Sequence, residues 1–129
     1  MNLKNSQYQA IMRQYDLRQM EHRHQQTLRY EELCNKLPAY RDLEDQIAAL
    51  YADRARAAVL GQAVQLQDML QQIQTLQHQQ RILMTRAGYP SDYLALTYTC
   101  PDCQDTGYIG QKRCHCLKQA AIDLVYTQS

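Results

Sequence analysis

The residues of this chain best suited to chemistry are four cysteines near its C-terminal end. Cys100 and Cys103 form a C-x-x-C pair, Cys114 and Cys116 form a C-x-C pair, and ten residues separate the two pairs. Two short segments folded face to face can each offer two thiolates, and four thiolates complete the tetrahedral coordination that Zn²⁺ prefers. We therefore predict a zinc site with these four cysteines as ligands.

Several alternatives to this site stay open. His115 lies inside the second pair and can replace Cys114 or Cys116, because imidazole is also a zinc ligand. Two disulfides would suit an oxidising compartment, but the N-terminus, MNLKNSQYQAIMRQ, has no apolar core, so we expect no signal peptide. A redox C-x-x-C would follow a βαβ pattern, and none precedes Cys100; free thiols without a metal are the remaining alternative. Because protein fills all four ligand positions, we expect a structural metal, whereas catalytic zinc keeps a position open for water.

The residues around the cysteines predict a small zinc-ribbon-like β-hairpin. Leu96–Thr99 and Tyr108–Ile109 are rich in aromatic and β-branched residues, which favours short strands. The segment Asp105-Thr106-Gly107 predicts a chain reversal, because glycine accepts positive φ and aspartate bonds to its own backbone two residues further on. Residues 117–126 then predict a helix whose apolar side chains fold back on the hairpin.

The first 87 residues predict long helices, because they contain one glycine, Gly61, and one proline, Pro38. We predict three helices, at Leu3–Leu37, Ala39–Leu60 and Gln62–Ala87, the last with Gly88 as its C-cap. The second and third can form an antiparallel hairpin, with the two apolar stripes of the first helix packed against it as a slender three-helix coiled coil. The predicted fold is therefore mostly α, with a helical coiled-coil region at 1–88 and a zinc-binding module with a C-terminal helix at 89–129.

Four other side chains are expected to have structural or solvated roles. Cys34 lies on an apolar stripe of the first helix, so we expect a buried, inert thiol. His22 and His24 lie in the polar middle of that helix, which we expect to protrude or fray, and both are predicted to be solvated. Gln80 occupies a core-type position of the third helix.

Composition argues against several classes of function. Fourteen Lys and Arg against 13 Asp and Glu leave a net charge of +1, so no global field indicates nucleic acid or an anionic membrane as a partner. No apolar run approaches the roughly 20 residues of a membrane span, and we expect a soluble, cytoplasmic protein. Four glycines cannot build a phosphate-binding P-loop, and no G-x-S-x-G or H-E-x-x-H motif is present, so we do not expect an enzyme.

Two non-enzymatic alternatives remain. Lys112, Arg113 and Lys118 cluster in sequence near Tyr108, a combination that single-stranded nucleic acids use for phosphate contact and base stacking. Packing of the tyrosine over the hairpin is the competing interpretation. The helices can also pair between chains, which would make the protein a coiled-coil homo-oligomer.

The last third of the chain resembles the DnaC/DnaI-like replicative helicase loaders of Firmicutes, in the part that precedes their ATPase domain. The resemblance rests on G-Y-P-S-D-Y-L at 88–94, Y-T-C-P-D-C-Q-D-T-G-Y-I-G-Q-K-R-C-H-C-L-K-Q at 98–119 and I-D-L-V-Y-T-Q-S at 122–129. It implies a docking domain that binds the replicative helicase during DNA replication, within the primosome, and that acts near single-stranded DNA. Cys100, Cys103, Cys114 and Cys116 match the family's cysteine positions. An AAA+ domain with the Walker motifs follows this region in the family, and we expect the present chain to stop where that domain would begin.

Overall fold

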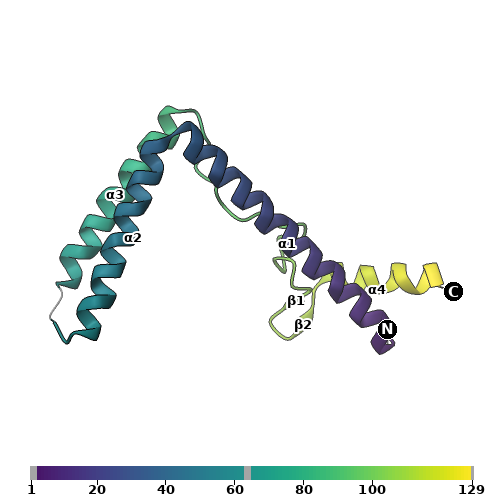
Figure 1. Cartoon of the computed structure of the whole chain (residues 1–129). Coiled ribbons are helices and arrows are strands. Elements are labelled where there is room, and N and C mark those ends of the chain that lie inside the picture. The colour runs from purple at the N-terminus through teal and green to yellow at the C-terminus, as the bar shows by residue number, and fades with distance from the viewer. Residues whose placement is uncertain (1–2, 63–64, 129) are drawn as a thin grey trace. The chain divides into compact units, whose positions relative to one another are not determined.

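A computed structural model describes residues 3–62 and 65–128, which form four helices and one short β-hairpin (Figure 1). The helices are α1 (Asn5–Lys36), α2 (Pro38–Val59), α3 (Leu66–Arg86) and α4 (His115–Gln128). The strands are β1 (Tyr108–Ile109) and β2 (Lys112–Arg113). Among these described helices, none combines the length and the apolar character needed to cross a membrane. The predicted fold class, mostly helical with a small hairpin and a C-terminal helix, is confirmed.

The chain forms two compact units, and α1 contributes to both of them. The helical-hairpin unit is Leu28–Leu94, and the cysteine unit combines the chain up to Thr27 with the chain from Ala95 onward. This division differs from the expected boundary at residue 88. The N-terminal part of α1, predicted to belong with the other long helices, belongs with the cysteines.

The ends of α2 and α3 follow the residues that predicted them. Pro38 lies in the first turn of α2, where its missing N–H costs no helical hydrogen bond. Gly61 follows α2 with φ +69° and Gly88 follows α3 with φ +86°, and both are left-handed conformations that glycine tolerates. The predicted third helix included Ala63 and Val64, which lie outside the described residues, and the observed α3 begins at Leu66.

The helical hairpin is held by apolar side chains that α2 and α3 direct toward each other, and the two helices lie side by side in Figure 1. Ile47 of α2 is buried against Met69 and Ile73 of α3, with Leu50 and Leu76 at the edge of the cluster. Met69, Ile73 and Leu76 of α3 thus pack within the chain. The antiparallel hairpin part of the predicted fold is confirmed.

Gln80 is buried in this hairpin, as its core-type position predicted. Its Nε2 donates a hydrogen bond of 2.7 Å to Oε2 of Glu44 and lies 3.5 Å from the carbonyl oxygen of Tyr40. A buried amide without partners would cost about 1–3 kcal/mol, so these contacts let a polar side chain occupy a core position.

The C-terminal part of α1 packs against the start of α2 and the end of α3. Leu33 and Cys34 are buried together with Tyr40 of α2 and Met84 of α3. This places the second apolar stripe of α1 against the hairpin, as predicted, and confirms that Cys34 is buried. The hydroxyl of Tyr93, in the segment after α3, donates a 2.9 Å hydrogen bond to Glu32 of α1.

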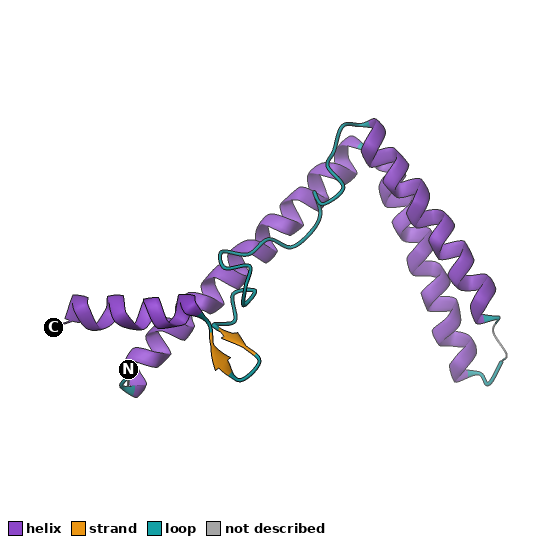
Figure 2. Cartoon of the chain, turned by 180° about the vertical axis from the view of Figure 1, so that it is seen from behind, coloured by secondary structure: helices purple, strands orange, loops and turns teal. Residues whose placement is uncertain are grey.

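The first apolar stripe of α1 has a different partner from the one predicted. Ile11 and Tyr15 are buried against Leu117 and Ala121 of α4 rather than against α2 and α3. Figure 2 shows α4 crossing the N-terminal part of α1. The expected packing of both stripes on the helical hairpin was therefore wrong for this one. The cysteine-rich segment has too little apolar surface of its own and takes its core from α1.

The strands also differ in part from the expectation. β1, at Tyr108–Ile109, was predicted, but it pairs antiparallel with β2, in the register Tyr108 to Arg113 and Ile109 to Lys112. The turn between them contains Gly110, with φ +62°. Leu96–Thr99, expected to be the other strand of the hairpin, is an irregular loop, and the side chains of Thr97 and Thr99 bond to His22 of α1.

Ile11→Ala should destabilise the cysteine unit, although Ile11 is far from the cysteines in sequence. We expect a loss of about 2–5 kcal/mol, because the substitution leaves a cavity under α4. Amide hydrogen exchange should show faster exchange across residues 107–121 and little change in α2 and α3. Leu17→Ala, on an exposed position of the same helix, is the control and should change neither. Equal effects of both substitutions would contradict the observed core.

Candidate metal centre

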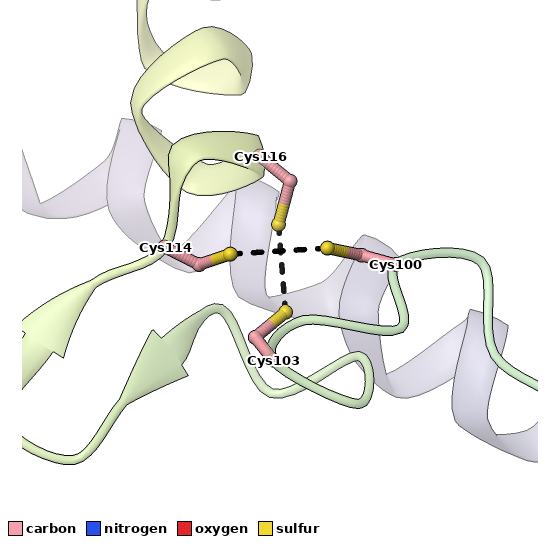
Figure 3. Close-up of side chains that lie close together, drawn as sticks. All are labelled: Cys100, Cys103, Cys114 and Cys116. Carbon is pink, nitrogen blue, oxygen red and sulfur yellow. Dashed lines mark hydrogen bonds between the residues drawn. The ribbon is translucent and has the colours of Figure 1, made fainter.

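The four cysteines predicted as ligands come together in the cysteine unit. Cys100 and Cys103 lie in the loop before β1, Cys114 follows β2, and Cys116 lies in the first turn of α4. Figure 3 shows the four side chains directing their sulfur atoms toward a common point. Cys100, Cys103 and Cys114 are buried and Cys116 is half-buried. We call this group the four-cysteine site.

The spacing of the sulfur atoms suits a single metal ion. The Sγ atoms of Cys100 and Cys114 are 3.8 Å apart, those of Cys103 and Cys116 are 3.5 Å apart, and all four lie within 4.8 Å of one another. A regular tetrahedron with metal–sulfur bonds of about 2.3 Å has edges of about 3.8 Å. A disulfide would bring two sulfurs to about 2.05 Å, and all five cysteines are free. The four cysteines can therefore hold a metal ion, and the disulfide alternative is not what this structure contains.

Asp105 shapes the loop that carries the first cysteine pair. Its carboxylate is buried and accepts hydrogen bonds from the backbone N–H of Thr99 at 2.9 Å and of Cys100 at 2.8 Å. Gln104 and Asp105 both have positive φ, 55° and 60°, which turns the chain sharply after Cys103. The sequence predicted a reversal here, but with aspartate bonded two residues further on. The observed bonds instead join Asp105 to Thr99 and Cys100, which precede it in the chain, and they fix the orientation of Cys100.

His22 of α1 belongs to the same hydrogen-bond network, so its expected solvation was wrong. Its Nδ1 is 2.8 Å from the hydroxyl of Thr97, and its Nε2 is 2.9 Å from that of Thr99 and 3.6 Å from Oδ2 of Asp105. Gln19, one turn earlier, donates a hydrogen bond of 2.6 Å to the Asp105 carbonyl. The polar middle of α1 therefore neither protrudes nor frays at these positions but positions the loop before Cys103.

Tyr15 and Gly107 contact the thiols directly. The Tyr15 hydroxyl lies 2.9 Å from Sγ of Cys116, and the backbone N–H of Gly107 donates to Sγ of Cys103 at 3.4 Å. Burial and the hydrogen bond to Cys116 raise the pKa of Tyr15 well above its ordinary value, so this hydroxyl keeps its proton. Both groups can donate to a thiolate, and such outer contacts orient and stabilise metal ligands.

The thiols do not all lose their protons with equal ease. Burial raises the pKa of Cys103, but the Gly107 amide and the neighbouring thiols more than offset this effect and lower it to about 7. Burial and hydrogen bonds with the other cysteines raise the pKa of Cys116 to about 12, against the opposing effect of Tyr15. Four clustered thiolates repel one another, so full deprotonation requires a cation among them.

His115 lies beside the four-cysteine site. Its Nε2 is 2.7 Å from Oδ2 of Asp102 and 3.8 Å from Sγ of Cys100, and its side chain is 69% exposed. All four sulfurs already face the common point. The geometry therefore favours four thiolate ligands over the alternative in which His115 replaces Cys114 or Cys116.

The residues named for nucleic-acid contact lie on the surface, with one exception. Lys112 and Arg113 form β2 and are exposed, and Lys118 is exposed on α4. Tyr108 is half-buried, packs against the core of the cysteine unit and shares a 2.7 Å hydrogen bond with the Tyr8 hydroxyl. The sequence left two roles open for Tyr108, base stacking or packing over the hairpin, and the observed contacts are those of packing.

Sequence reasoning missed the part of the site that α1 provides. Tyr15, Gln19 and His22 follow one another at the spacing i, i+4 and i+7, which places them on one face of a helix. This spacing is the only local signal, and it does not say what the face contacts. Their partners lie 75 or more positions further along the chain.

Gly107→Ala should weaken the four-cysteine site more than Gly110→Ala does. A Cβ at Gly107 would lie 3.3 Å from two ring carbons of Tyr15, whereas one at Gly110 would have nothing within 4 Å. Both glycines have positive φ, so both substitutions should cost about 1–2 kcal/mol of backbone strain. Overpacking at Gly107 should add about 1–3 kcal/mol. Denaturant unfolding of the metal-loaded protein measures the difference, and equal losses would contradict the close contact with Tyr15.

No protein-family model, no curated protein and no solved structure matched the chain. The function of the four-cysteine site therefore has to follow from its own geometry and from the chemistry of its residues.

Proposed function

We propose that the four-cysteine site binds one structural Zn²⁺ ion. Tetrahedral sites of four sulfurs are typical of zinc or of iron–sulfur centres. Sulfur separations of 3.5 and 3.8 Å suit one ion rather than a multi-atom cluster. Four protein ligands would leave no position for a reacting water, which supports a structural rather than a catalytic metal. Cys100, Cys103, Cys114 and Cys116 would hold the ion.

The metal would contribute directly to the folding of the cysteine unit. The strands have two residues each, and the cluster around the cysteines contains no other buried apolar side chain among the described residues. A two-stranded hairpin of this size is not stable alone in water. Metal binding and folding of the loop, hairpin and start of α4 would therefore be coupled.

Elemental analysis should find one zinc per chain in the wild type and a marked loss in Cys103→Ser. Cys34→Ser is the matched control, because Cys34 is buried in the helical-hairpin unit and should not affect zinc content. Chelation should reduce the ordered structure of residues 100–121, while far-ultraviolet circular dichroism retains the signal of α2 and α3. Iron in place of zinc, or zinc retained in Cys103→Ser, would overturn the assignment.

We further propose that the chain is a non-catalytic docking domain of a cytoplasmic replicative helicase loader. The observation that carries this proposal is that the stretch resembling the loaders, residues 98–119, is the stretch that folds into the four-cysteine site. The helical-hairpin unit and the cysteine unit each offer a surface for a protein partner. Val59 and Leu60 at the end of α2, and Leu66 and Leu70 at the start of α3, are exposed apolar side chains of the hairpin.

ATP use would belong to an AAA+ domain of the loader and not to the residues present here. The printed sequence contains no P-loop motif, and a metal ion bound by all four cysteines would have no open ligand position. In this proposal the domain holds the helicase while the ATPase domain delivers it to single-stranded DNA.

Pull-down of the cognate replicative helicase by this chain tests the docking proposal. We expect binding at micromolar concentration, with weaker binding after Leu66→Ser together with Leu70→Ser if the hairpin provides the contact. Leu17→Ser, exposed on α1, is the matched control. Absence of binding by the wild type would overturn the proposal.

Two other outcomes would redirect the assignment. Salt-dependent binding of single strands that is lost in a Lys112→Ala, Arg113→Ala, Lys118→Ala variant would indicate a nucleic-acid module instead. A concentration-dependent dimer without either partner would indicate a coiled-coil oligomer.

A further inference from the structure

A surface cavity opens onto one side of the four-cysteine site. Its volume is about 430 Å³, and it is lined by two of the four cysteines, Cys100 and Cys116, together with Asp102, His115 and Asp123. Two thiols of the site therefore line a cavity that is open to solvent, and carboxylate and imidazole side chains line the same cavity. Through this cavity a cation could approach the sulfurs by way of other potential ligands.

Three of these side chains already converge. The Nε2 atom of His115 is 2.7 Å from Oδ2 of Asp102 and 3.8 Å from Sγ of Cys100, and the three ligand atoms lie within 4.8 Å of one another. Asp102 and His115 are 64% and 69% exposed, so both can adjust by a few tenths of an ångström. Imidazole, carboxylate and thiolate are the three protein ligand types that zinc and related divalent ions use.

We propose that Cys100, Asp102 and His115 form an outer metal position through which divalent metal ions reach and leave the four-cysteine site. The inference rests on the proposed metal occupancy of that site. Three ligands leave a fourth position to water, which makes the outer position weak and open to exchange, unlike the closed four-sulfur site. Because both positions share Cys100, an ion can pass from one to the other while it stays bound to that sulfur.

One divalent ion enters as another leaves, so the exchange as a whole changes neither the net charge nor the number of bound protons. An incoming divalent ion binds His115 Nε2, Asp102 Oδ2 and Sγ of Cys100 in place of the contact between His115 and Asp102. Any proton displaced from that contact goes to solvent and returns when the ion has moved on to the sulfurs. The incoming ion then takes over the remaining sulfurs one by one as the resident ion releases them and departs with water ligands. Arg18 is the cation that also lines the cavity. Its guanidinium lies over the Tyr15 ring, 5.3 Å from the ring centre, and is not one of the three converging groups.

Replacement of bound zinc by Cd²⁺ in the zinc-loaded protein tests the outer position. The absorbance of cadmium–thiolate bonds reports the rate, measured as a function of Cd²⁺ concentration. In the wild type the rate should saturate, because Cd²⁺ first fills the outer position. His115→Ala and Asp102→Asn should slow exchange about tenfold or more and abolish the saturation, with the same final spectrum.

Asp123→Asn is the matched control, because it removes a carboxylate from the same cavity without removing a ligand atom of the converging group. It should exchange within about twofold of the wild type. Unchanged rates in both ligand variants, or equal slowing in Asp123→Asn, would overturn the outer position. A final spectrum with fewer thiolate bonds in His115→Ala would also overturn it, because His115 would then support the inner site itself. Failure of the four-cysteine proposal is distinct, since the wild type would then show no cadmium–thiolate absorbance.

Discussion

Contact between α1 and the cysteine-rich end of the chain is the constraint on which the rest of the site depends. The loop, two short strands and first turn of α4 cannot bury their own thiols, because they contain almost no apolar surface. Tyr15 provides part of what is missing: its ring lies against Gly107, and its hydroxyl reaches Cys116. Ile11 completes the packing under α4. The four-cysteine site is therefore assembled from two distant parts of the chain. Its geometry depends on side chains of α1 as well as on the four cysteines.

Features determined by neighbouring residues could be predicted from the sequence. Pro38, Gly61 and Gly88 mark helix ends through backbone properties that act within one turn, and the observed helices begin and end beside them. The clustering of Cys100, Cys103, Cys114 and Cys116 follows from two short cysteine spacings, each of which holds two thiols close together. Gln80 was recognisable as a core position from helical periodicity, although its partner Glu44 was not.

Features determined by distant partners could not be predicted. The apolar stripe around Ile11 and Tyr15 is equally compatible with packing on α2 and α3 or on α4, because periodicity identifies a buried face but not its neighbour. Leu96–Thr99 has strand-forming residues, yet Thr97 and Thr99 bond to His22 of α1, and the segment stays irregular. For the same reason the boundary expected at residue 88 differs from the observed units, since the change in composition there does not follow the tertiary contacts.

The two parts of the cysteine unit also become available at different times during synthesis. Tyr15 and Cys116 are 101 positions apart, which a ribosome covers in about 5–20 seconds. The helical-hairpin unit lies between them and depends on contacts nearby in sequence, so it can fold in far less time than that. Ile11 and Tyr15 therefore have no α4 to pack against until Cys116 and the residues after it have been synthesised. Capture of a metal ion would then complete the cysteine unit after the helical-hairpin unit has folded.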